Sequence, residues 1–255
     1  MGLPDTVKRK LWNGNNMISF IIPTKNEEKE LAETLKWILS YSGEKEIIVS
    51  DGRSRDRTVE IAREMGARVV EYTGKAKQTI SAGRNGGAAV AKGEFYVFLD
   101  ADVRIKDPDA FFRTAQDFFR KNPRLVALTV WLQVLPGLET FFDRIIFTCA
   151  NIVHIIFNNI CSIAAAPGEF QMVRAEAFKK TGGYNEKLAA GEDYDFFKRM
   201  GKLGDTRFNL HLKVYHTGRR AHVVGWPKLL FTWGMNAFSV WFLNKAVSEE
   251  WTEVR

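Results

Sequence analysis

Short apolar runs alternate with helical patterns along the N-terminal part of the chain. The runs are rich in β-branched and aromatic residues and span 17–23, 46–51, 67–72 and 94–100. Between them, apolar residues recur three and four positions apart, which is the spacing of an amphipathic helix. Strands joined through helices pair in parallel, and a parallel sheet is covered on both faces. The alternation therefore predicts an α/β fold with a mostly parallel sheet flanked by helices.

The remainder of the chain is less regular. Its predicted elements are a helix at 107–121, a strand at 124–134, a short helix from about Glu192 and a strand at 207–216. No internal repeat and no low-complexity linker divides the sequence, so we expect one composite domain. A polar tail at 1–16 precedes this domain, and an apolar, amphipathic helical segment at 218–255 follows it.

The composition is that of a folded protein with a mild excess of positive charge. Hydrophobic residues make up 45% and charged residues 26%, which excludes wholesale disorder. The net charge of +7 favours an anionic partner, although an excess of this size is also common in proteins without one. The first residues lack the apolar stretch of a secretory signal, so none is expected. Cys149 and Cys161 lack CxxC spacing and are expected to be buried thiols in a reducing compartment.

Polar clusters follow three of the four N-terminal strands. They are TKNEE after the first strand, DGRSRD after the second and DADV after the fourth. The carboxyl ends of parallel strands meet at one edge of the sheet, where α/β proteins bind their ligands. We therefore expect the three clusters to form one site.

Asp100 and Asp102 stand two residues apart at the end of the fourth strand, where their side chains point the same way. Two close carboxylates repel each other unless a cation lies beside them. Mg²⁺ and Mn²⁺ take oxygen ligands and often bind through one or two carboxylates together with substrate phosphates. The pair therefore predicts a divalent cation site. The alternative is two acids that merely end a strand, with Asp102 capping a helix.

Further charged residues surround the predicted site. Asp51 precedes Gly52, which suits a tight turn, and Lys75, Lys77 and Arg84 lie among glycines where the backbone could approach a diphosphate. The alternatives are an ordinary turn acid and a solvated helix face. The sequence has no Walker P-loop, because GxxxxGK[ST] is absent.

Four motifs, taken in order, carry a family resemblance: FIIPTKNEE, IIVSDGRSRDRT, AGRNGGAAVAKGEFYVFLDADV and GGYNEKLAAGEDYDFFKRM. They resemble the inverting glycosyltransferases of family 2, over roughly Ile18 to His216. The resemblance implies the GT-A fold of nucleotide-diphospho-sugar transferases. It also implies a catalytic domain at 17–217, with a nucleotide-sugar-binding half at 17–106 and an acceptor half at 107–217.

The resemblance assigns roles to the donor side of the site. Asn26 and Glu27, with Asp51, match the part of the family that holds the base and ribose of a nucleotide-sugar. In the D-x-D motif, Asp102 would bind the metal on the diphosphate, and Asp100 the ribose or the same metal. The substrate-binding residues expected on this basis are Pro23, Asn26, Glu27, Asp51, Lys75, Arg84, Asp100, Ala101 and Asp102.

The resemblance also assigns a base and a metal ligand in the second half. Asp193, in GEDYD, matches the acidic residue that serves as general base on the acceptor, and Glu192 is its rival. His216 resembles a histidine that completes the metal site in some members, the alternative being an ordinary strand-end histidine. The implied cofactor is a divalent cation, Mn²⁺ or Mg²⁺, with Asp102, Asp100 and His216 as ligands.

The implied reaction is transfer of a sugar, with inversion, from a UDP- or GDP-linked donor to an acceptor hydroxyl or phosphate. QMVRA precedes the base and lacks the tryptophan of the Q-x-x-R-W motif, so we do not expect a processive polysaccharide synthase. Arg53 departs from the usual serine or glycine and leaves the base open. One alternative is a nucleotidyltransferase, which TKNEE disfavours because it replaces a glycine- and arginine-rich loop. The other is a non-catalytic module that binds anionic membranes or nucleic acid; for the enzyme, no nucleic acid partner is expected.

Two apolar segments, 145–168 and 229–243, leave two interpretations open. Along the first, four polar side chains share one helical stripe: Thr148, Asn151, Asn158 and Ser162. That pattern is amphipathic, unlike an all-apolar membrane span. Both segments either pack on the catalytic domain or contact a membrane surface and a lipid-linked acceptor, as in the polyprenyl-phosphate sugar synthases of the family. We expect a cytoplasmic protein, peripheral at the inner face of the cell membrane in the second case.

Overall fold

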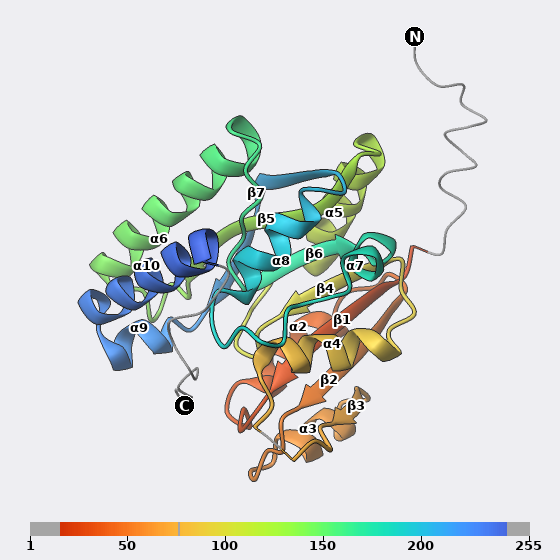
Figure 1. Cartoon of the computed structure of the whole chain (residues 1–255). Coiled ribbons are helices and arrows are strands. Elements are labelled where there is room, and N and C mark those ends of the chain that lie inside the picture. The colour runs from red at the N-terminus through yellow and green to blue at the C-terminus, as the bar shows by residue number, and fades with distance from the viewer. Residues whose placement is uncertain (1–15, 76, 244–255) are drawn as a thin grey trace, which may run out of the picture.

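The computed structural model describes residues 16–75 and 77–243 (Figure 1). Of the predicted polar tail at 1–16, only residue 16 falls within these residues, and 244–255 of the predicted C-terminal segment fall outside them. The described residues form a seven-stranded sheet flanked by helices. The predicted α/β fold is confirmed.

The strands are β1 (Ile18–Thr24), β2 (Lys45–Asp51), β3 (Arg68–Glu71), β4 (Phe95–Leu99), β5 (Leu125–Val134), β6 (Phe170–Arg174) and β7 (Asp205–His216). Their order in the sheet is β3-β2-β1-β4-β6-β5-β7. The first four strands are parallel, as the alternation predicts, and β5 is parallel to β7. Only β6 runs antiparallel to its neighbours, β4 and β5.

The helices are α2 (Leu31–Leu39), α3 (Thr58–Glu64), α4 (Ile80–Val90), α5 (Pro108–Lys121), α6 (Phe141–Ile155), the π-helical turn η1 (Ile156–Ile160), α7 (Ala175–Thr181), α8 (Glu192–Met200), α9 (Arg219–Val224) and α10 (Trp226–Leu243). Helix α8 begins at the predicted residue. Helix α2 begins at Leu31, and the preceding TKNEE segment ends β1 and continues as a loop at the edge of the sheet.

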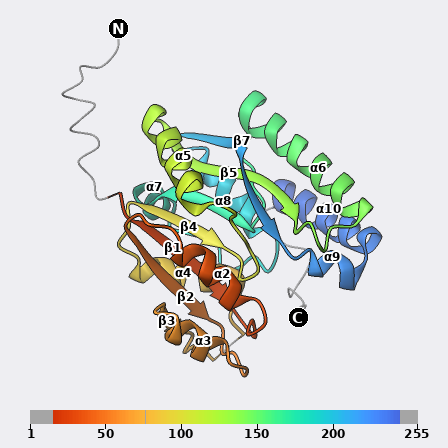
Figure 2. The ribbon, with the colours of Figure 1, turned by 180° about the vertical axis from the view of Figure 1, so that it is seen from behind.

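The core lies on both faces of the sheet, and successive side chains of β4 alternate between them. Phe95, Val97 and Leu99 pack in the cluster that includes residues of α2, α3 and α5. Tyr96 and Phe98 pack in the cluster that includes residues of α4, α7 and α8. Figures 1 and 2 show these two groups of helices on opposite faces. Burial on both faces explains why β4 is an unbroken apolar run.

Strand β6 is not among the predicted elements, which include no strand between 134 and 207. It is a short buried strand inserted between β4 and β5. An antiparallel strand needs no crossover helix, so strand–helix alternation gives no sign of it. Its insertion brings the residue before it, Glu169, to the carboxyl end of β4, where the Asp100 amide donates to the Glu169 carbonyl at 3.3 Å.

Helix α6 continues into η1 and lies outside the sheet. By length and composition, Phe141–Ile160 is the one helix among the described residues that could cross a membrane, and 28% of its apolar window is buried. Cys149 and Cys161 are both exposed, so the prediction of buried thiols is wrong. The reason for Cys149 is that α6 turns its polar stripe toward the protein, and this residue lies on the opposite stripe.

Candidate active site

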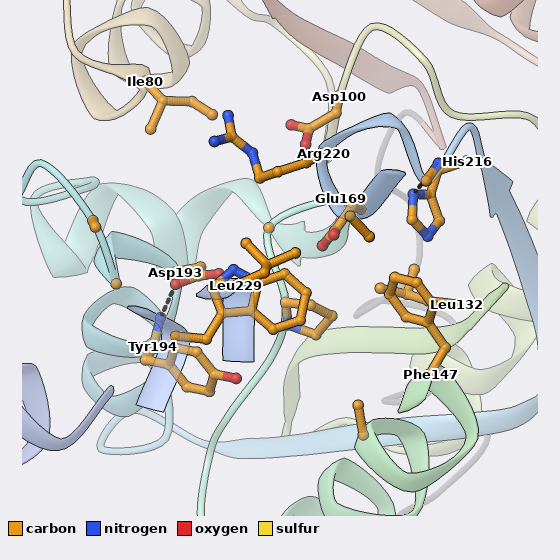
Figure 3. A pocket seen from close by; sticks show the side chains of 18 of the residues that line it. Ile80, Asp100, Leu132, Phe147, Glu169, Asp193, Tyr194, His216, Arg220 and Leu229 are labelled. Atoms are coloured by element: carbon orange, nitrogen blue, oxygen red, sulfur yellow. Dashed lines mark hydrogen bonds between the residues drawn. The ribbon is translucent and has the colours of Figure 1, made fainter. Parts of the chain in front are cut away.

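A cavity of about 260 Å³ lies beyond the carboxyl end of β4 (Figure 3). Five residues predicted for the site line it: Arg84, Asp100, Asp102, Asp193 and His216. They come from α4, the end of β4, α8 and the end of β7. The structure therefore brings together residues that are more than a hundred positions apart in the sequence.

Helix α4 delivers a buried cation to this cavity. A Cβ atom added at Gly87 would lie 2.5 Å from the Ile21 side chain, so glycine at this position lets α4 lie directly against β1. Arg84, about one turn earlier, is fully buried. Its guanidinium donates to Glu192 at 3.0 Å and to Asp100 at 3.3 Å. Burial of a charged group at this depth is strongly unfavourable unless opposite charges pair with it, as these carboxylates do.

The Asp102 carboxylate lies among cations and donors. Thr217 donates its hydroxyl to Asp102, and the Arg219 Nε lies 3.6 Å away. Arg219 also donates two hydrogen bonds to Glu27, at 2.7 and 2.8 Å. Burial alone would raise the pKa of Asp102, but Arg219 and then His216 and Thr217 hold it below the usual value. Asp102 is therefore ionised at neutral pH.

The carboxylic acids nearer Arg84 have pKa values that are raised instead of lowered. Burial raises the pKa of Asp100 to about 7, against the attraction of Arg84. Burial likewise raises the pKa of Glu169, and burial followed by repulsion from Glu192 raises the pKa of Asp193 well above its ordinary value. This side of the cavity holds more carboxylates than its single buried guanidinium can neutralise.

Asp193 is the second residue of α8, which begins directly after Gly191, whose φ of 73° is in the left-handed region. Its carboxylate accepts from the Tyr194 amide at 2.8 Å and reaches into the cavity (Figure 3). Its rival Glu192 is held instead by Arg84 in a buried ion pair. Of the two acids, Asp193 has no cation bound directly to it in the described contacts, which favours it for accepting a proton.

The donor set at the end of β4 has the chemistry of a divalent cation site. Asp100 and Asp102 offer oxygen atoms, and the buried His216 Nε2 has no hydrogen-bond partner within the described structure. Burial lowers the pKa of His216, which keeps the ring neutral as metal binding requires. Its Nδ1 accepts from the Gly218 amide at 3.2 Å, so binding through Nε2 calls for the other tautomer.

No three histidine, cysteine, aspartate or glutamate side chains converge as a metal cluster within residues 16–75 and 77–243. The donors nevertheless fit Mg²⁺ or Mn²⁺, because these ions commonly bind through one or two carboxylates and complete their coordination with water and substrate phosphates.

A second cavity, of about 640 Å³, lies at the ends of β1 and β2. Asn26, with φ of 54°, lines it and accepts from the Arg55 amide at 2.8 Å. Asp51 is buried below it and accepts from the Ser54 amide at 2.8 Å. These bonds join the two loops into one wall, whose cationic lining residues are Lys25, Arg53, Arg55 and Lys77.

The remaining predicted site residues line neither cavity. Pro23 is half-buried in β1 against α4, and Ala101 is buried with its carbonyl accepting from Thr34. Lys75 is exposed in the loop between β3 and α4. Glu27 is connected to the first cavity through Arg219, which lines that cavity and donates to it.

Two residues of the first cavity were missed in the sequence. Arg219 follows the predicted His216 in HTGRR, but its carboxylate partners Glu27 and Asp102 are distant in the sequence, so the sequence gives no sign of the contact. Glu169 carried no signal, because its position depends on the unexpected strand β6.

Comparison with known proteins identifies the family. The sequence profile of glycosyl transferase family 2 matches residues 19–182, more than half of the chain. The chain belongs to glycosyl transferase family 2. The family predicted from the four motifs is thereby confirmed, and with it the class of enzyme, a glycosyltransferase.

A curated relative in this family is the 4,4'-diaponeurosporenoate glycosyltransferase of Staphylococcus haemolyticus. It is 28% identical over 242 residues, which cover 88% of this chain and 63% of the relative. The chain thus spans less than two thirds of the length of this relative.

Solved structures confirm the GT-A fold. TarS 1–349 of S. aureus in complex with UDP is 21% identical, with a TM-score of 0.63, covering 92% of this chain and 67% of that one. The mannosyltransferase PcManGT of Pyrobaculum calidifontis, in complex with GDP-Man and Mn²⁺, is 18% identical, with a TM-score of 0.62, covering 81% and 58%.

Proposed function

We propose that this glycosyltransferase moves a sugar from a nucleotide-diphosphate sugar to an acceptor hydroxyl or phosphate in a single displacement that inverts the anomeric centre. The observation that carries the proposal is the first cavity, which holds the Asp100–Asp102 pair and Asp193 around one space. A cation-binding pair and a separate base are the two parts that such a displacement needs.

The donor would lie along the ends of β1, β2 and β4. Asn26 and Asp51 would hold the nucleoside, and the cations around the second cavity suit an anionic ligand. Arg84, between Asp100 and Glu192, would face the sugar end of the donor. Similar structures contain UDP or GDP-Man, so either base is compatible with this arrangement.

Asp100, Asp102 and His216 would hold Mn²⁺ or Mg²⁺ beside the diphosphate. A divalent cation supplies positive charge that stabilises the departing nucleoside diphosphate. Arg219, 3.6 Å from Asp102, adds a fixed positive charge on the same side of the cavity.

On the acceptor side, Asp193 would take the proton of the attacking hydroxyl. The acceptor oxygen then forms a bond to the anomeric carbon while the bond from that carbon to the diphosphate oxygen breaks. A general base works best with a pKa near the working pH, and the cavity raises the pKa of Asp193 in that direction.

The acceptor would carry an apolar chain. The cavity has an apolar wall formed by Leu132, Phe147, Ala150, Leu229 and Trp233, and the polar Asn151, His154 and Asn236 line it as well. An acceptor whose reactive end is polar and whose remainder is hydrocarbon would fit this mixed lining. Such an acceptor would be lipid-linked, and the protein would then act at a membrane surface, on its cytoplasmic side.

A thermal-shift panel tests the proposal directly. UDP-, GDP- and dTDP-sugars are added with and without Mn²⁺, and the expected result is a stabilisation by one base class that requires the cation. A nucleotidyltransferase would respond to a nucleoside triphosphate instead. Absence of any Mn²⁺-dependent shift across the panel would overturn the donor and cation assignments.

A further inference from the structure

Helix α6 has its polar side turned toward the protein. Its buried residues include Asp143, Asn151 and His154, and Asn158 of η1 is buried in line with them. Each has a partner inside the fold; for example, Asn151 bonds both the amide and the carbonyl of Leu132, at 3.0 and 2.8 Å. These bonds fix the rotation of the helix about its axis.

The opposite side of α6 is apolar and exposed. Its large exposed residues are Phe141, Phe142, Ile145, Ile152, Val153, Ile156 and Ile160. Phe141 and Ile160, at the two ends, are each 73% exposed. On a 3.6-residue helix these positions fall within one sector, opposite the buried polar residues. A helix in a water-soluble surface normally has the reverse arrangement.

Helices α9 and α10, which contact α6 through His222 and Trp226, also expose apolar side chains. Val223 of α9 and Leu230, Phe231 and Met235 of α10 are exposed, Phe231 by 71%. Figures 1 and 2 both show α6 and α10 side by side, and the rings of Phe147 and Trp226 are 5.4 Å apart. The exposed apolar residues of these three helices form what we term the apolar face.

The charges around the apolar face have a positive excess. From 141 to 163 and from 219 to 236 the one acid is Asp143, and it is fully buried. Arg144 is exposed and pairs with Glu139 at 2.8 Å, and Lys228 of α10 is also exposed. Anionic lipid head groups complement a rim with this excess of cations.

The helix lies on the protein and does not leave it. Besides the bonds of Asn151 to β5, Asn159 bonds the carbonyl and amide of Phe208 in β7, at 2.9 and 3.0 Å. Crossing a membrane would break these contacts and expose the buried Asp143 to hydrocarbon. An amphipathic helix in such a position lies in the plane of the lipid–water interface.

We propose that the apolar face is a membrane-docking surface. Through it, α6 and α10 would lie in the head-group region of an anionic lipid bilayer. This inference rests on the proposed function, because the inner sides of the same two helices line the apolar wall of the active-site cavity. Docking would hold that wall at the depth where the hydrocarbon chain of an acceptor begins.

Vesicle flotation tests the docking. The whole chain is mixed with phosphatidylcholine vesicles or with vesicles that also contain phosphatidylglycerol. We expect it to float with the second and much less with the first. Failure to float with either overturns the proposal. So does a dimer detected by light scattering that the substitutions below convert to monomer, because the apolar face then binds a second copy.

Substitutions test whether flotation depends on the apolar face or on exposed apolar side chains anywhere on the protein. Phe141→Ser combined with Phe142→Ser should lower the bound fraction about tenfold, since burial of each ring contributes to binding. Ile152→Ser, on the face, is matched by Leu39→Ser on α2, because the native side chains are 46% and 42% exposed. Only the first should weaken flotation; equal effects would overturn the assignment of the surface.

A last comparison distinguishes failure of docking from failure of the proposed function. Asp102→Asn should still float but lose the Mn²⁺-dependent thermal shift with the nucleotide. The double phenylalanine variant should keep that shift and lose flotation. If Asp102→Asn keeps the shift while docking behaves as expected, the donor assignment is wrong and the docking surface stands.

Discussion

The two ends of the active-site cavity, around Asp102 and around Asp193, differ in their electrostatic surroundings. At the first end, Arg219 and Thr217 stabilise the ionised form and the pKa of Asp102 is lowered. At the second, burial and Glu192 raise the pKa of Asp193. When two carboxylates in one site have pKa values shifted in opposite directions, they are suited to different chemical roles. The first end is suited to hold cations and the second to exchange a proton.

The largest expected effect comes from removing the proton acceptor. Asp193→Asn should lower sugar transfer about a thousandfold, since general-base catalysis contributes on this scale. Transfer is measured as radiolabelled sugar moved into a lipid extract, and the Mn²⁺-dependent thermal shift should persist. Asp195→Asn is the matched control, because Asp195 lies two residues further along α8 and pairs with Arg199. Full transfer by Asp193→Asn would exclude it as the base.

Removing the cation-holding acid should have a different signature. Asp102→Asn should abolish the Mn²⁺-dependent part of the nucleotide thermal shift and lower transfer about a hundredfold, through loss of charge stabilisation. Asp117→Asn, in an exposed ion pair on α5, serves as control. An unchanged nucleotide affinity with Mn²⁺ would contradict the metal role and remove the contrast between the two ends.

A smaller loss of sugar transfer is expected from a substitution at Gly168, which lies beside Arg84 in the cavity. A Cβ at Gly168 would lie 2.9 Å from Arg84 Nη2 and 3.5 Å from Asp193 Oδ2. Gly168→Ala should therefore displace the guanidinium and lower transfer about tenfold, with destabilisation of about 1–3 kcal/mol. Gly137→Ala, which meets no atom within 4 Å, should change neither. Wild-type transfer by Gly168→Ala would mean that the position of Arg84 is not critical.

The smallest effect concerns stability and pH. Because the folded-state pKa of Asp193 is raised, the folded protein holds that proton more tightly than the unfolded chain does. Stability from this group is therefore lost as pH rises from the ordinary aspartate pKa through the raised one. Asp193→Asn should raise Tm by about 2–4 °C at pH 8 and by less at pH 5, seen by calorimetry. A larger rise in Tm at pH 5 than at pH 8 would show that folding lowers the pKa of Asp193 instead of raising it.

Much of the fold and part of the site followed from local patterns. Buried strands and helical spacing gave the parallel sheet, and its topology placed Asp100 and Asp102 at the ligand edge. The antiparallel strand β6 could not be predicted in this way, because it is short and leads directly into a helix, as a loop could. Without β6, nothing in the sequence gave a reason to place Glu169 at the site.

Long-range pairs formed the second gap. Arg219 lies 192 residues from Glu27, and no periodicity connects them. The exposure of Cys149 has another cause: an amphipathic pattern shows that α6 has two sides but not which side faces the protein. The sequence therefore left open whether the apolar side packs on the domain, and in the structure most of that side is exposed.

The pair formed by Arg84 and Glu192 also limits how the molecule can move. It joins α4 to α8, and so connects the predicted nucleotide-sugar-binding half to the predicted acceptor half. Separation of the two helices would break this 3.0 Å ion pair and leave the buried guanidinium with Asp100 as its carboxylate partner. The pair therefore opposes separation of α4 from α8, the helices that carry Arg84 and Asp193 to the cavity.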